Sequence, residues 1–427
     1  MKTVAFHTLG CKLNFTESSS LLREFIANGY EQVDFFSKAD VYVVNTCTVT
    51  AIAEKKCRNA IHRARRQNPQ AVIAVVGCYT QIHSDNIAQY EDVDIILGNT
   101  NKHLLLSYID KLSKGKASII DVADISKDRD FIASYSFTDR TRSFLKIQDG
   151  CDYFCTYCEV PIARGRSRSD SITNTVTRAQ ELACEGKKEI VLTGVNIGEF
   201  GKNNGEDFFG LVQALDQVQG IERYRISSIE PNLITNQIID YVASSRAFLP
   251  HFHIPLQAGT NYLLKLMHRR YDTELFAQKL NYIHSVMPHA FLAADVIVGF
   301  PGEDNKQFKE EIEFLCDLPL SALHIFTYSE RPNTPAINFE GKVPMSRRKE
   351  RSLVLQELSK KMKEEFYTAN IGSERSILWE ADYKDGQMFG FSENYIRCAR
   401  PLDERLVNQI TKETLLHLDE GKEHFLI

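Results

Sequence analysis

Long hydrophobic runs are missing from this 427-residue sequence. No apolar stretch approaches the ~18 residues that a membrane-spanning helix needs. A secretion signal is also lacking, because Met1–Phe6 leads directly into a short strand-like pattern. We therefore expect a protein of the reducing cytoplasm, where clustered thiols are more often metal ligands than halves of disulfides.

A strong charge of one sign is absent as well. The formal net charge is -5, so the field of the whole molecule offers no attraction to nucleic acid, and any RNA contact must be local. Long internal repeats and low-complexity tracts are also absent. The length is too great for one hydrophobic core and predicts two or three domains.

The most informative cysteines are Cys151, Cys155 and Cys158, which stand at C-x3-C-x2-C spacing. Three thiols can hold three corners of a cubane iron–sulfur cluster and leave one iron open, whereas electron-transfer cubanes normally take four thiolates. Zinc is the alternative, but zinc is usually held by paired motifs, and no second C-x2-C pair or nearby histidine follows. The spacing therefore favours a cluster with an open coordination site.

The N-terminal region, roughly the first 110 residues, alternates between strand-like and helical patterns, which is typical of a mainly parallel sheet of the α/β class. Strands are predicted at 4–9, 41–44, 71–76 and 93–97, and helices at 15–27 and 51–66.

Three further cysteines, Cys11, Cys47 and Cys78, follow three successive predicted strands. Because the carboxyl ends of parallel strands emerge at one edge of a sheet, these thiols are expected to converge on a second three-thiol site. Independent core cysteines would lie within strands instead. The other thiols lack partners at ligand spacing and are expected to be buried or neutral: Cys57, Cys184, Cys316 and Cys398.

A second alternating region, from about residue 142 to about 331, carries about six strand–helix units and predicts a partial (β/α)6 barrel. The Cys151 loop follows its first strand, so this loop would lie at the carboxyl-terminal mouth, where barrel active sites lie. The strands are expected at 144–147, 189–192, 224–227, 251–254, 293–298 and 322–326. Residues at other strand ends would line the same pocket or form ordinary turns: Thr193, Gly194, Ser227, Glu230 and Gln257.

The C-terminal region combines one long charged helix with short strands. Residues 344–370 carry a helical pattern rich in Lys, Arg and Glu, which predicts a connecting helix with a solvated face. Strand candidates follow at 376–380, 388–391, 395–398 and 424–427, with Gly and Asp turns between them. They predict a small appended β-barrel.

Local groups of cations are the candidates for RNA contact. Six of them crowd the helix predicted at 51–66, although a basic helix is often only a solvated face. The C-terminal region is acidic on balance, so its RNA surface must be restricted to a patch, with Arg397 and Arg400 expected on one strand face or as ordinary surface charge. Near the predicted barrel mouth the candidates are Arg164, Arg166, Arg168, Arg269 and Arg270.

Together these motifs resemble the methylthiotransferase family of radical S-adenosylmethionine (SAM) enzymes over essentially the whole chain. Tyr157 matches the aromatic position of the cluster loop in that family. Residues 8–14 and 45–50 look most like the MtaB branch, whose members act on N6-threonylcarbamoyladenosine at position 37 of tRNA. Further matching segments are Pro161–Gly165, Pro255–Gly259, Asp295–Glu303 and Tyr328–Arg331.

The resemblance implies three domains: an N-terminal methylthiotransferase domain over 1–115, a radical SAM core over 137–366 and a TRAM-like β domain over 367–427. It implies SAM and two 4Fe-4S clusters as cofactors. The auxiliary cluster would take Cys11, Cys47 and Cys78, and the SAM-cleaving cluster Cys151, Cys155 and Cys158. Tyr157 and the strand-end residues Thr193, Gly194, Ser227, Glu230 and Gln257 would bind the cofactor.

The implied reaction transfers a methylthio group to carbon 2 of the modified adenosine by way of a 5′-deoxyadenosyl radical. The same chemistry on isopentenyladenosine in tRNA or on a ribosomal-protein aspartate is an alternative, and so is a non-enzymatic iron–sulfur protein that binds RNA or senses redox state. The expected partners are the tRNA anticodon stem-loop, a low-potential electron donor such as flavodoxin or ferredoxin, and a sulfur donor. The protein is expected to act as a monomer.

Positions beside the cysteines carry further expectations. Lys12, Leu13 and the segment 48–50 follow auxiliary-cluster cysteines and are expected to help select the threonylcarbamoyl group, with Lys12 or a nearby arginine pairing with its carboxylate. The alternative is an exposed Lys12, with only the barrel arginines in contact with this group. Glu159 departs from the family pattern, so its carboxylate would either affect the cluster or face solvent. The predicted substrate-binding residues are Lys12, Arg164, Arg166, Arg168, Arg397 and Arg400.

Overall fold

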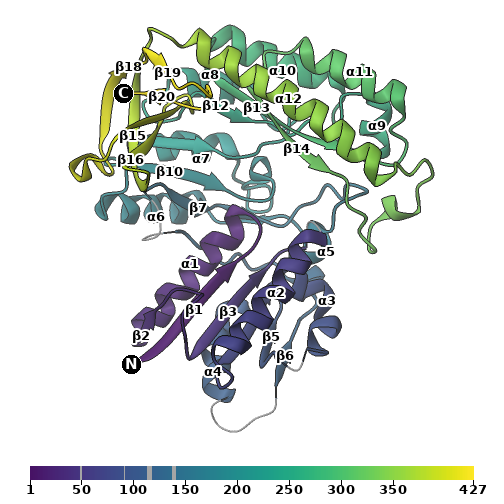
Figure 1. Ribbon diagram of the computed structural model, residues 1–427, viewed down its shortest axis with the longest axis vertical. Helices are drawn as coiled ribbons and strands as arrows, with labels where there is room; N and C mark the ends of the chain where they lie inside the picture. The colour runs from purple at the N-terminus through teal and green to yellow at the C-terminus, as the bar shows by residue number, and fades with distance from the viewer. Residues whose placement is uncertain (49–50, 91, 113–117, 137–140) are drawn as a thin grey trace. The chain divides into compact units, whose positions relative to one another are not determined.

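The computed structural model describes residues 1–48, 51–90, 92–112, 118–136 and 141–427, and it divides into two compact units (Figure 1). The predicted domain ends at residues 115 and 137 lie outside the described residues, so these boundaries stay predictions. Unit 1 comprises Met1–Phe137, Phe144–Phe154 and Cys158–Ser169, and unit 2 comprises Thr138–Ser143, Cys155–Tyr157 and Asp170–Ile427.

Unit 1 contains a parallel sheet with strand order β2-β1-β3-β4-β5-β6. Two edge strands, β2 (Tyr30–Gln32) and β6 (Ile119–Asp121), escape prediction because three partly exposed residues give no hydrophobic alternation. The four strands between them confirm the predicted ones: β1 (Lys2–Thr8), β3 (Val41–Thr46), β4 (Val72–Gly77) and β5 (Ile95–Leu97).

Helices cover both faces of this sheet (Figure 1). Helices α1 (Lys12–Ala27) and α4 (Leu105–Leu112) pack on one face, and α2 (Ala51–Gln67) and α3 (Cys78–Ala88) on the other. Helix α2 buries Cys57, Ile61 and Ala64, whose spacing puts them on one side of the helix. Burial raises the pKa of the Cys57 thiol to about 12, so this cysteine is the neutral core residue that the sequence predicts.

A second part of unit 1 carries most of the Cys151 loop. It contains β7 (Ser143–Lys146), β8 (Gln148–Asp149), α5 (Val160–Arg164) and β9 (Arg168–Ser169). Strands β8 and β9 pair antiparallel and so draw the flanks of the loop together. Gly150 has φ +70, and a Cβ there would lie 2.0 Å from the carbonyl oxygen of Arg166, so only glycine fits directly before Cys151.

Unit 2 begins with the barrel strands that the sequence predicts. Strands β10 (Glu189–Thr193) and β11 (Arg223–Ile226) pair in parallel, and so do β12 (His251–His253), β13 (Phe291–Val298) and β14 (Ala322–Thr327). A parallel bridge between Ser228 and His253 connects the two groups. The predicted α/β partial barrel is confirmed by this arrangement.

Helices alternate with these strands, and their starts are set by side-chain caps. Each of six helices begins after a Ser, Thr or Asp whose side-chain oxygen accepts a hydrogen bond from an N–H of the first turn. They are α6 (Ile172–Cys184), α7 (Phe208–Asp216), α8 (Asn236–Ser244), α9 (Asn261–Leu266), α10 (Thr273–Val286) and α11 (Asn305–Cys316). Short 3-10 helices occur at Lys102–Leu104, Ile125–Lys127, Ile197–Glu199, Pro335–Asn338 and Glu404–Leu406.

The long helix α12 (Met345–Ala369) packs on β13 and β14 and leads into the C-terminal sheet, as predicted. That sheet, ordered β18-β15-β16-β17-β20-β19, curls into a half-barrel (Figure 1). Trp379 is buried in the hydrophobic core of this half-barrel. Arg223 of β11 donates to the carbonyl oxygens of Ser376 and Phe391 and so fastens the half-barrel to the barrel strands. Its strands are β15 (Glu374–Lys384), β16 (Gln387–Ser392), β17 (Arg397–Pro401), β18 (Ile410–Thr414), β19 (His417–Leu418) and β20 (Phe425–Leu426).

Candidate functional site

The three N-terminal cysteines lie at the carboxyl ends of neighbouring strands. Cys47 directly follows β3, Cys78 directly follows β4, and Cys11 stands just beyond β1. A Cβ built on Gly10, which has φ +96, would lie 2.7 Å from the sulfur of Cys47. The chain beside Cys11 therefore lies against Cys47, and Cys11 also interacts electrostatically with Cys78. That the three thiols share one cluster stays a prediction.

Polar groups surround this set of thiols. The side-chain amide of Asn99 donates to the sulfur of Cys78 at 3.6 Å and to the carbonyl oxygen of Ala163 at 2.7 Å. The Oδ1 of Asn14 lies 3.9 Å from the sulfur of Cys11 and accepts a hydrogen bond from Arg164 at 2.6 Å. An N–H donor such as that of Asn99 is an outer contact that orients a thiolate ligand, whereas the Asn14 oxygen can only accept a hydrogen bond from the Cys11 thiol.

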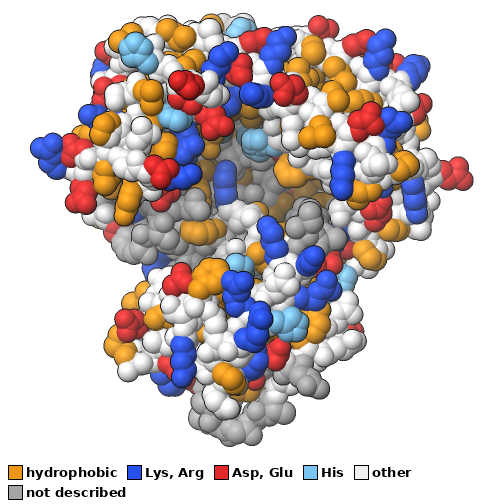
Figure 2. Space-filling model, in the orientation of Figure 1, with side chains coloured by type: hydrophobic (Ala, Val, Ile, Leu, Met, Phe, Trp, Pro, Cys, Tyr) orange, Lys and Arg blue, Asp and Glu red, His pale blue; other side chains and the backbone are white. Residues whose placement is uncertain are grey.

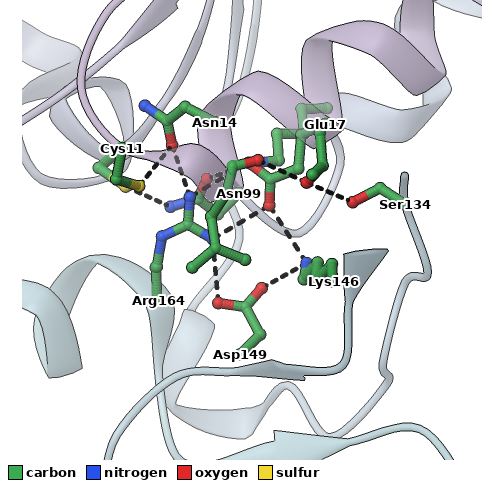
Figure 3. A network of polar contacts seen from close by, with 12 residues as sticks. Cys11, Asn14, Glu17, Asn99, Ser134, Lys146, Asp149 and Arg164 are labelled. Atoms are coloured by element: carbon green, nitrogen blue, oxygen red, sulfur yellow. Dashed lines mark hydrogen bonds and ion pairs between the residues drawn. The ribbon is translucent and has the colours of Figure 1, made fainter. Parts of the chain in front are cut away.

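Behind the thiols lies a buried network of charges (Figure 3). The Glu17 carboxylate accepts from Lys102 at 2.5 Å, from Lys146 at 3.1 Å and from Arg164 at 3.0 Å. Asp149 pairs with Lys146 at 2.6 Å and with Arg164 at 2.9 Å. Burial alone would raise the pKa of Glu17, but the three cations outweigh burial and hold its pKa far below the usual range.

Arg164 is the link between this network and the cysteines. Burial disfavours its charge, yet attraction to Cys78, Glu17 and Asp149 holds its pKa well above the ordinary value. Arg168 is also buried, and it lies 3.5 Å from Asp149. Of the three arginines predicted to contact RNA here, the structure leaves only Arg166 exposed, at 55% of its side chain. The two buried ones are instead placed to support the cysteine site.

In the Cys151 loop, N–H groups point at sulfur atoms. The backbone N–H groups of Tyr153 and Val160 donate to the sulfurs of Cys151 and Cys158, each at 3.4 Å. In unit 2, the Arg269 guanidinium donates to the sulfur of Cys155 at 3.2 Å. None of the ten cysteines, all of which lie among the described residues, is in a disulfide. Thiols that accept hydrogen bonds from N–H groups fit the ligand set of an iron–sulfur cluster, since hydrogen bonds to sulfur are a main control on such sites.

Arg269 gathers several residues around Cys155. Its guanidinium forms an ion pair with Glu230 and lies within 3.4 Å of the Tyr157 hydroxyl and 2.9 Å of the Tyr271 hydroxyl. Burial raises the pKa of Glu230 despite this cation. Tyr157 and Glu230 thus both contact Arg269, and their role in cofactor binding stays a prediction. Arg269, an RNA candidate in the sequence, is buried beside a cysteine.

The remaining predicted cofactor residues lie at strand ends of unit 2. Thr193 ends β10, with Gly194 next, and Ser227 directly follows β11. Gln257 follows β12 and has φ +73, a backbone conformation that is uncommon outside glycine. Their positions after the carboxyl ends of barrel strands are where a cofactor pocket would lie, and their role in cofactor binding stays a prediction.

Glu159 does not face solvent, and its predicted effect on the cluster stays a prediction. It is buried and accepts a hydrogen bond from Thr48 at 2.7 Å. Because Glu159 follows Cys158 and Thr48 follows Cys47, this bond connects the neighbours of the two cysteine sets inside unit 1. Lys12 is exposed at the first position of α1, and residues 49 and 50 lie outside the described residues.

The two arginines of β17 stack on aromatic rings, whereas most cations of α2 are exposed. Arg397 and Arg400 do not share a strand face, because residues three apart in a strand point to opposite sides: Arg397 stacks on Phe389 and Arg400 on Trp379. On unit 1, Lys and Arg side chains gather where α2 runs (Figure 2). The exposed ones on this helix are Lys55, Lys56, Arg58, Arg63 and Arg66.

The sequence reading misses one polar cluster in unit 2. His253, Asp295 and His324 come from β12, β13 and β14, and their polar atoms lie within 4.8 Å of one another. The sequence signal for this cluster is a titratable residue in each of three consecutive predicted strands.

Comparisons with known proteins agree with this geometry. A family model described as the Radical SAM superfamily matches residues 145–315, and the uncharacterized protein family UPF0004 matches residues 3–98. The threonylcarbamoyladenosine tRNA methylthiotransferase MtaB of Bacillus subtilis (strain 168) is 41% identical over 424 residues, which cover 97% of this chain and 94% of that protein. The chain belongs to the MtaB methylthiotransferase family.

The chain is also similar to a second kind of tRNA-modifying enzyme and, in fold alone, to a solved radical SAM structure. A tRNA-2-methylthio-N(6)-dimethylallyladenosine synthase of Pelotomaculum thermopropionicum is 32% identical, over 92% of this chain and 90% of that protein. The radical SAM methyltransferase TsrM from Kitasatospora setae has a similar fold, with a TM-score of 0.59 over 79% of this chain and 75% of TsrM at 13% identity. Among the described helices of this MtaB-family chain, none is both long and apolar enough to span a membrane.

Proposed function

We propose that this protein transfers a methylthio group to carbon 2 of N6-threonylcarbamoyladenosine in tRNA, which gives 2-methylthio-N6-threonylcarbamoyladenosine. The observation that carries the proposal is the presence of two three-cysteine sets, one at three strand ends and one in the Cys151 loop. Similarity to MtaB of Bacillus subtilis over almost the whole chain supports the choice of substrate.

In this proposal each cysteine set holds one 4Fe-4S cluster. Cys11, Cys47 and Cys78 hold the auxiliary cluster, and Cys151, Cys155 and Cys158 hold the cluster that meets SAM. When bound, the clusters and SAM supply the radical and sulfur chemistry that no side chain provides. The protein's part is to orient the thiolates, through Asn99 at Cys78 and Arg269 at Cys155.

The other residues are assigned to binding. Tyr157, Thr193, Gly194, Ser227, Glu230 and Gln257 bind SAM in this proposal. Lys12, Arg166, Arg397 and Arg400 remain candidates for contact with the tRNA anticodon stem-loop, and the exposed cations of α2 join them. The domain division at 1–115, 137–366 and 367–427 is part of the same proposal, as are a monomeric state, a cytoplasmic location, a low-potential electron donor and a sulfur donor.

A second candidate substrate is isopentenyladenosine in tRNA. It is favoured by the similarity to the dimethylallyladenosine synthase, although at 32% identity rather than 41%. A matched set of tRNAs separates the two candidates, because only the substituent on N6 differs.

The decisive experiment uses anaerobically reconstituted protein on one tRNA that bears threonylcarbamoyladenosine, isopentenyladenosine or plain adenosine. Mass spectrometry of the nucleosides should show the methylthio product only with the first. Nucleosides from a deletion strain should lack the same product. Turnover of the isopentenyl tRNA at an equal rate would contradict the substrate assignment, and absence of any methylthio product would contradict the proposed reaction.

A further inference from the structure

The cluster of His253, Asp295 and His324 lies on one face of the β12–β13–β14 sheet. Asp295 is directly paired with His324 in the register of β13 and β14, and His253 pairs with Ala293, two residues away. Residues that alternate along strands share a face, so the three side chains emerge together. The opposite face carries α12, where Ser359 bonds to the backbone of Leu323.

One carboxylate oxygen organises both imidazoles. The Oδ1 of Asp295 lies 2.7 Å from the Nε2 of His253 and 3.3 Å from the Nδ1 of His324. Burial would raise the pKa of Asp295, but hydrogen bonds from His253 and His324 outweigh burial and hold its pKa well below the usual range. An ionised carboxylate only accepts hydrogen bonds, so the Nδ1 of His324 carries its proton toward Asp295.

This arrangement leaves the other side of the His324 ring for an external group. The side chain of His324 is 50% exposed, whereas that of Asp295 is 15% exposed. Two residues further along β14, on the same face, Phe326 is 47% exposed. An oriented imidazole nitrogen beside an exposed aromatic ring is a suitable surface for a substituted purine, because the ring stacks and the nitrogen forms a hydrogen bond.

The cluster also lies close to the residues around Cys155. Asp295 is near enough to Glu230 that its charge contributes to the raised pKa of Glu230, after burial. Glu230 pairs with Arg269, which donates to the sulfur of Cys155. The backbone N–H of Gln257 donates to the carbonyl oxygen of Asp295 at 2.7 Å. The cluster is thus bonded through the backbone of Asp295 to Gln257, one of the residues assigned to SAM.

A metal ion is the other occupant that two histidines and a carboxylate could suit. The distance between Asp295 and His253 argues against it. Ligands about 2.0 Å from one tetrahedral ion lie more than 3 Å apart, whereas 2.7 Å is the length of a direct hydrogen bond. The side chains therefore form a hydrogen-bonded group in which one carboxylate oxygen of Asp295 holds both imidazoles.

We propose that His324, oriented by Asp295 and supported by His253, recognises the polar substituent on N6 of the adenosine. This inference rests on the proposed function. The threonylcarbamoyl group offers a urea N–H, a hydroxyl and a carboxylate, and an imidazole can bond to any of them. An isopentenyl group offers none, so its binding would cover the outer imidazole nitrogen of His324 without giving that nitrogen a polar partner. Sites built to bond a polar group discriminate strongly against analogues that lack it.

The test measures binding and turnover with cluster-reconstituted protein. Anticodon stem-loops that bear threonylcarbamoyladenosine or plain adenosine are titrated by fluorescence anisotropy, and kcat/KM is measured on the corresponding tRNA. His324→Phe keeps an aromatic ring and removes the nitrogens, whereas His324→Gln keeps a hydrogen-bonding group. His284→Phe is the matched control, since His284 is an exposed histidine on α10.

We expect His324→Phe to weaken binding of the threonylcarbamoyl stem-loop about tenfold to a hundredfold and to leave binding of the plain stem-loop unchanged. His324→Gln should retain part of the preference for the threonylcarbamoyl stem-loop over the plain one. Asp295→Asn should lose part of this preference, and His284→Phe should show the same preference as the wild type. Iron content and SAM cleavage should be the same in all proteins. A purely structural role would weaken both stem-loops equally.

Two results would overturn the inference. One is a His324→Phe protein whose preference for the threonylcarbamoyl stem-loop equals that of the wild type. The other is stoichiometric zinc, manganese or nickel in the wild type that is lost in Asp295→Asn, which would make the cluster a metal site. Failure of the proposed function is a separate result, because the wild type itself would then show no activity on threonylcarbamoyladenosine tRNA.

Discussion

The two cysteine sets reach similar surroundings by different routes. In the Cys151 loop, eight consecutive residues carry all three thiols, and neighbouring backbone N–H groups point at two of the sulfurs. The set of Cys11, Cys47 and Cys78 depends on three strands and on the order in which these strands pair. The loop is thus specified locally, whereas the strand-end set depends on the whole of unit 1.

The support behind the two sets differs as well. A buried network of Glu17, Asp149, Lys102, Lys146 and Arg164 stands behind the strand-end set. At Cys155 the support is one guanidinium, that of Arg269, paired with Glu230. Because a buried ionic network is stable only when it is complete, the strand-end set should be the more sensitive of the two to distant substitutions.

The largest expected effect comes from removing either set of thiols. Alanine at Cys151, Cys155 and Cys158 should abolish SAM cleavage and leave about four irons per chain. Alanine at Cys11, Cys47 and Cys78 should also leave about four irons, with SAM cleavage retained and no methylthio product. Iron assays and product analysis check both proteins. Full iron content in the second protein would mean that the strand ends hold no cluster.

The second-largest effect is expected from removing Glu17, the carboxylate that three cations of the buried network share. Glu17→Ala should destabilise unit 1 by about 3–5 kcal/mol, because three buried cations lose their shared partner. Hydrogen exchange followed by mass spectrometry would report the loss in peptides of unit 1. Glu350→Ala is the control, since its exposed pair with Arg347 should contribute at most about 1 kcal/mol. Equal effects of the two substitutions would show that the network is not a structural support.

Two kinds of buried carboxyl group, one in each unit, should also respond to pH in opposite directions. The pKa of Glu17 and of Asp149 is depressed by cations, so their stabilisation is present above the carboxyl pKa of the unfolded chain, about 4, and is lost as the pH falls below it. In unit 2, burial raises the pKa of Glu311 to about 8, so the folded state holds an extra proton and loses stability as the pH rises from about 4 to 8.

Glu311→Gln tests the second half of this contrast. In the wild type, Glu311 should lower the stability of unit 2 by up to about 1.4 kcal/mol for each pH unit between pH 5 and 7, and in the variant this pH dependence should disappear. Glu311 bonds to the backbone N–H of Gly259 beside the Gln257 turn, so hydrogen exchange in that segment is the most direct measurement. Parallel pH profiles for wild type and variant would show that Glu311 is ionised in the folded state.

The smallest effect is expected at the two exposed cysteines that belong to neither set. Cys184 and Cys316 are exposed, so replacement of both by serine should change stability by no more than about 0.5 kcal/mol. Iron content and methylthio product should equal those of the wild type. Loss of iron in this double variant would mean that a ligand has been assigned to the wrong cysteine.

The sequence by itself determined the parts of this protein that depend on short-range pattern. Short apolar segments that alternate with helical patterns predicted the strands of both units. The spacing of Cys151, Cys155 and Cys158 predicted a ligand loop. The strand-end cysteines were also predictable, because a parallel sheet forces strand ends to one edge. Edge strands β2 and β6 were not, because their few residues are partly exposed and carry no periodic signal.

Only the tertiary structure decided what the charged residues do. Arg164 and Arg168 follow the cluster loop as an exposed basic stripe would, yet both are buried against carboxylates that come from other segments of unit 1. His253, Asp295 and His324 are separated in sequence and meet only because β12, β13 and β14 pair in register. Local pattern fixes where a strand or helix forms, but the partner of a charge is fixed by which elements pack together, and that choice depends on burying the whole core.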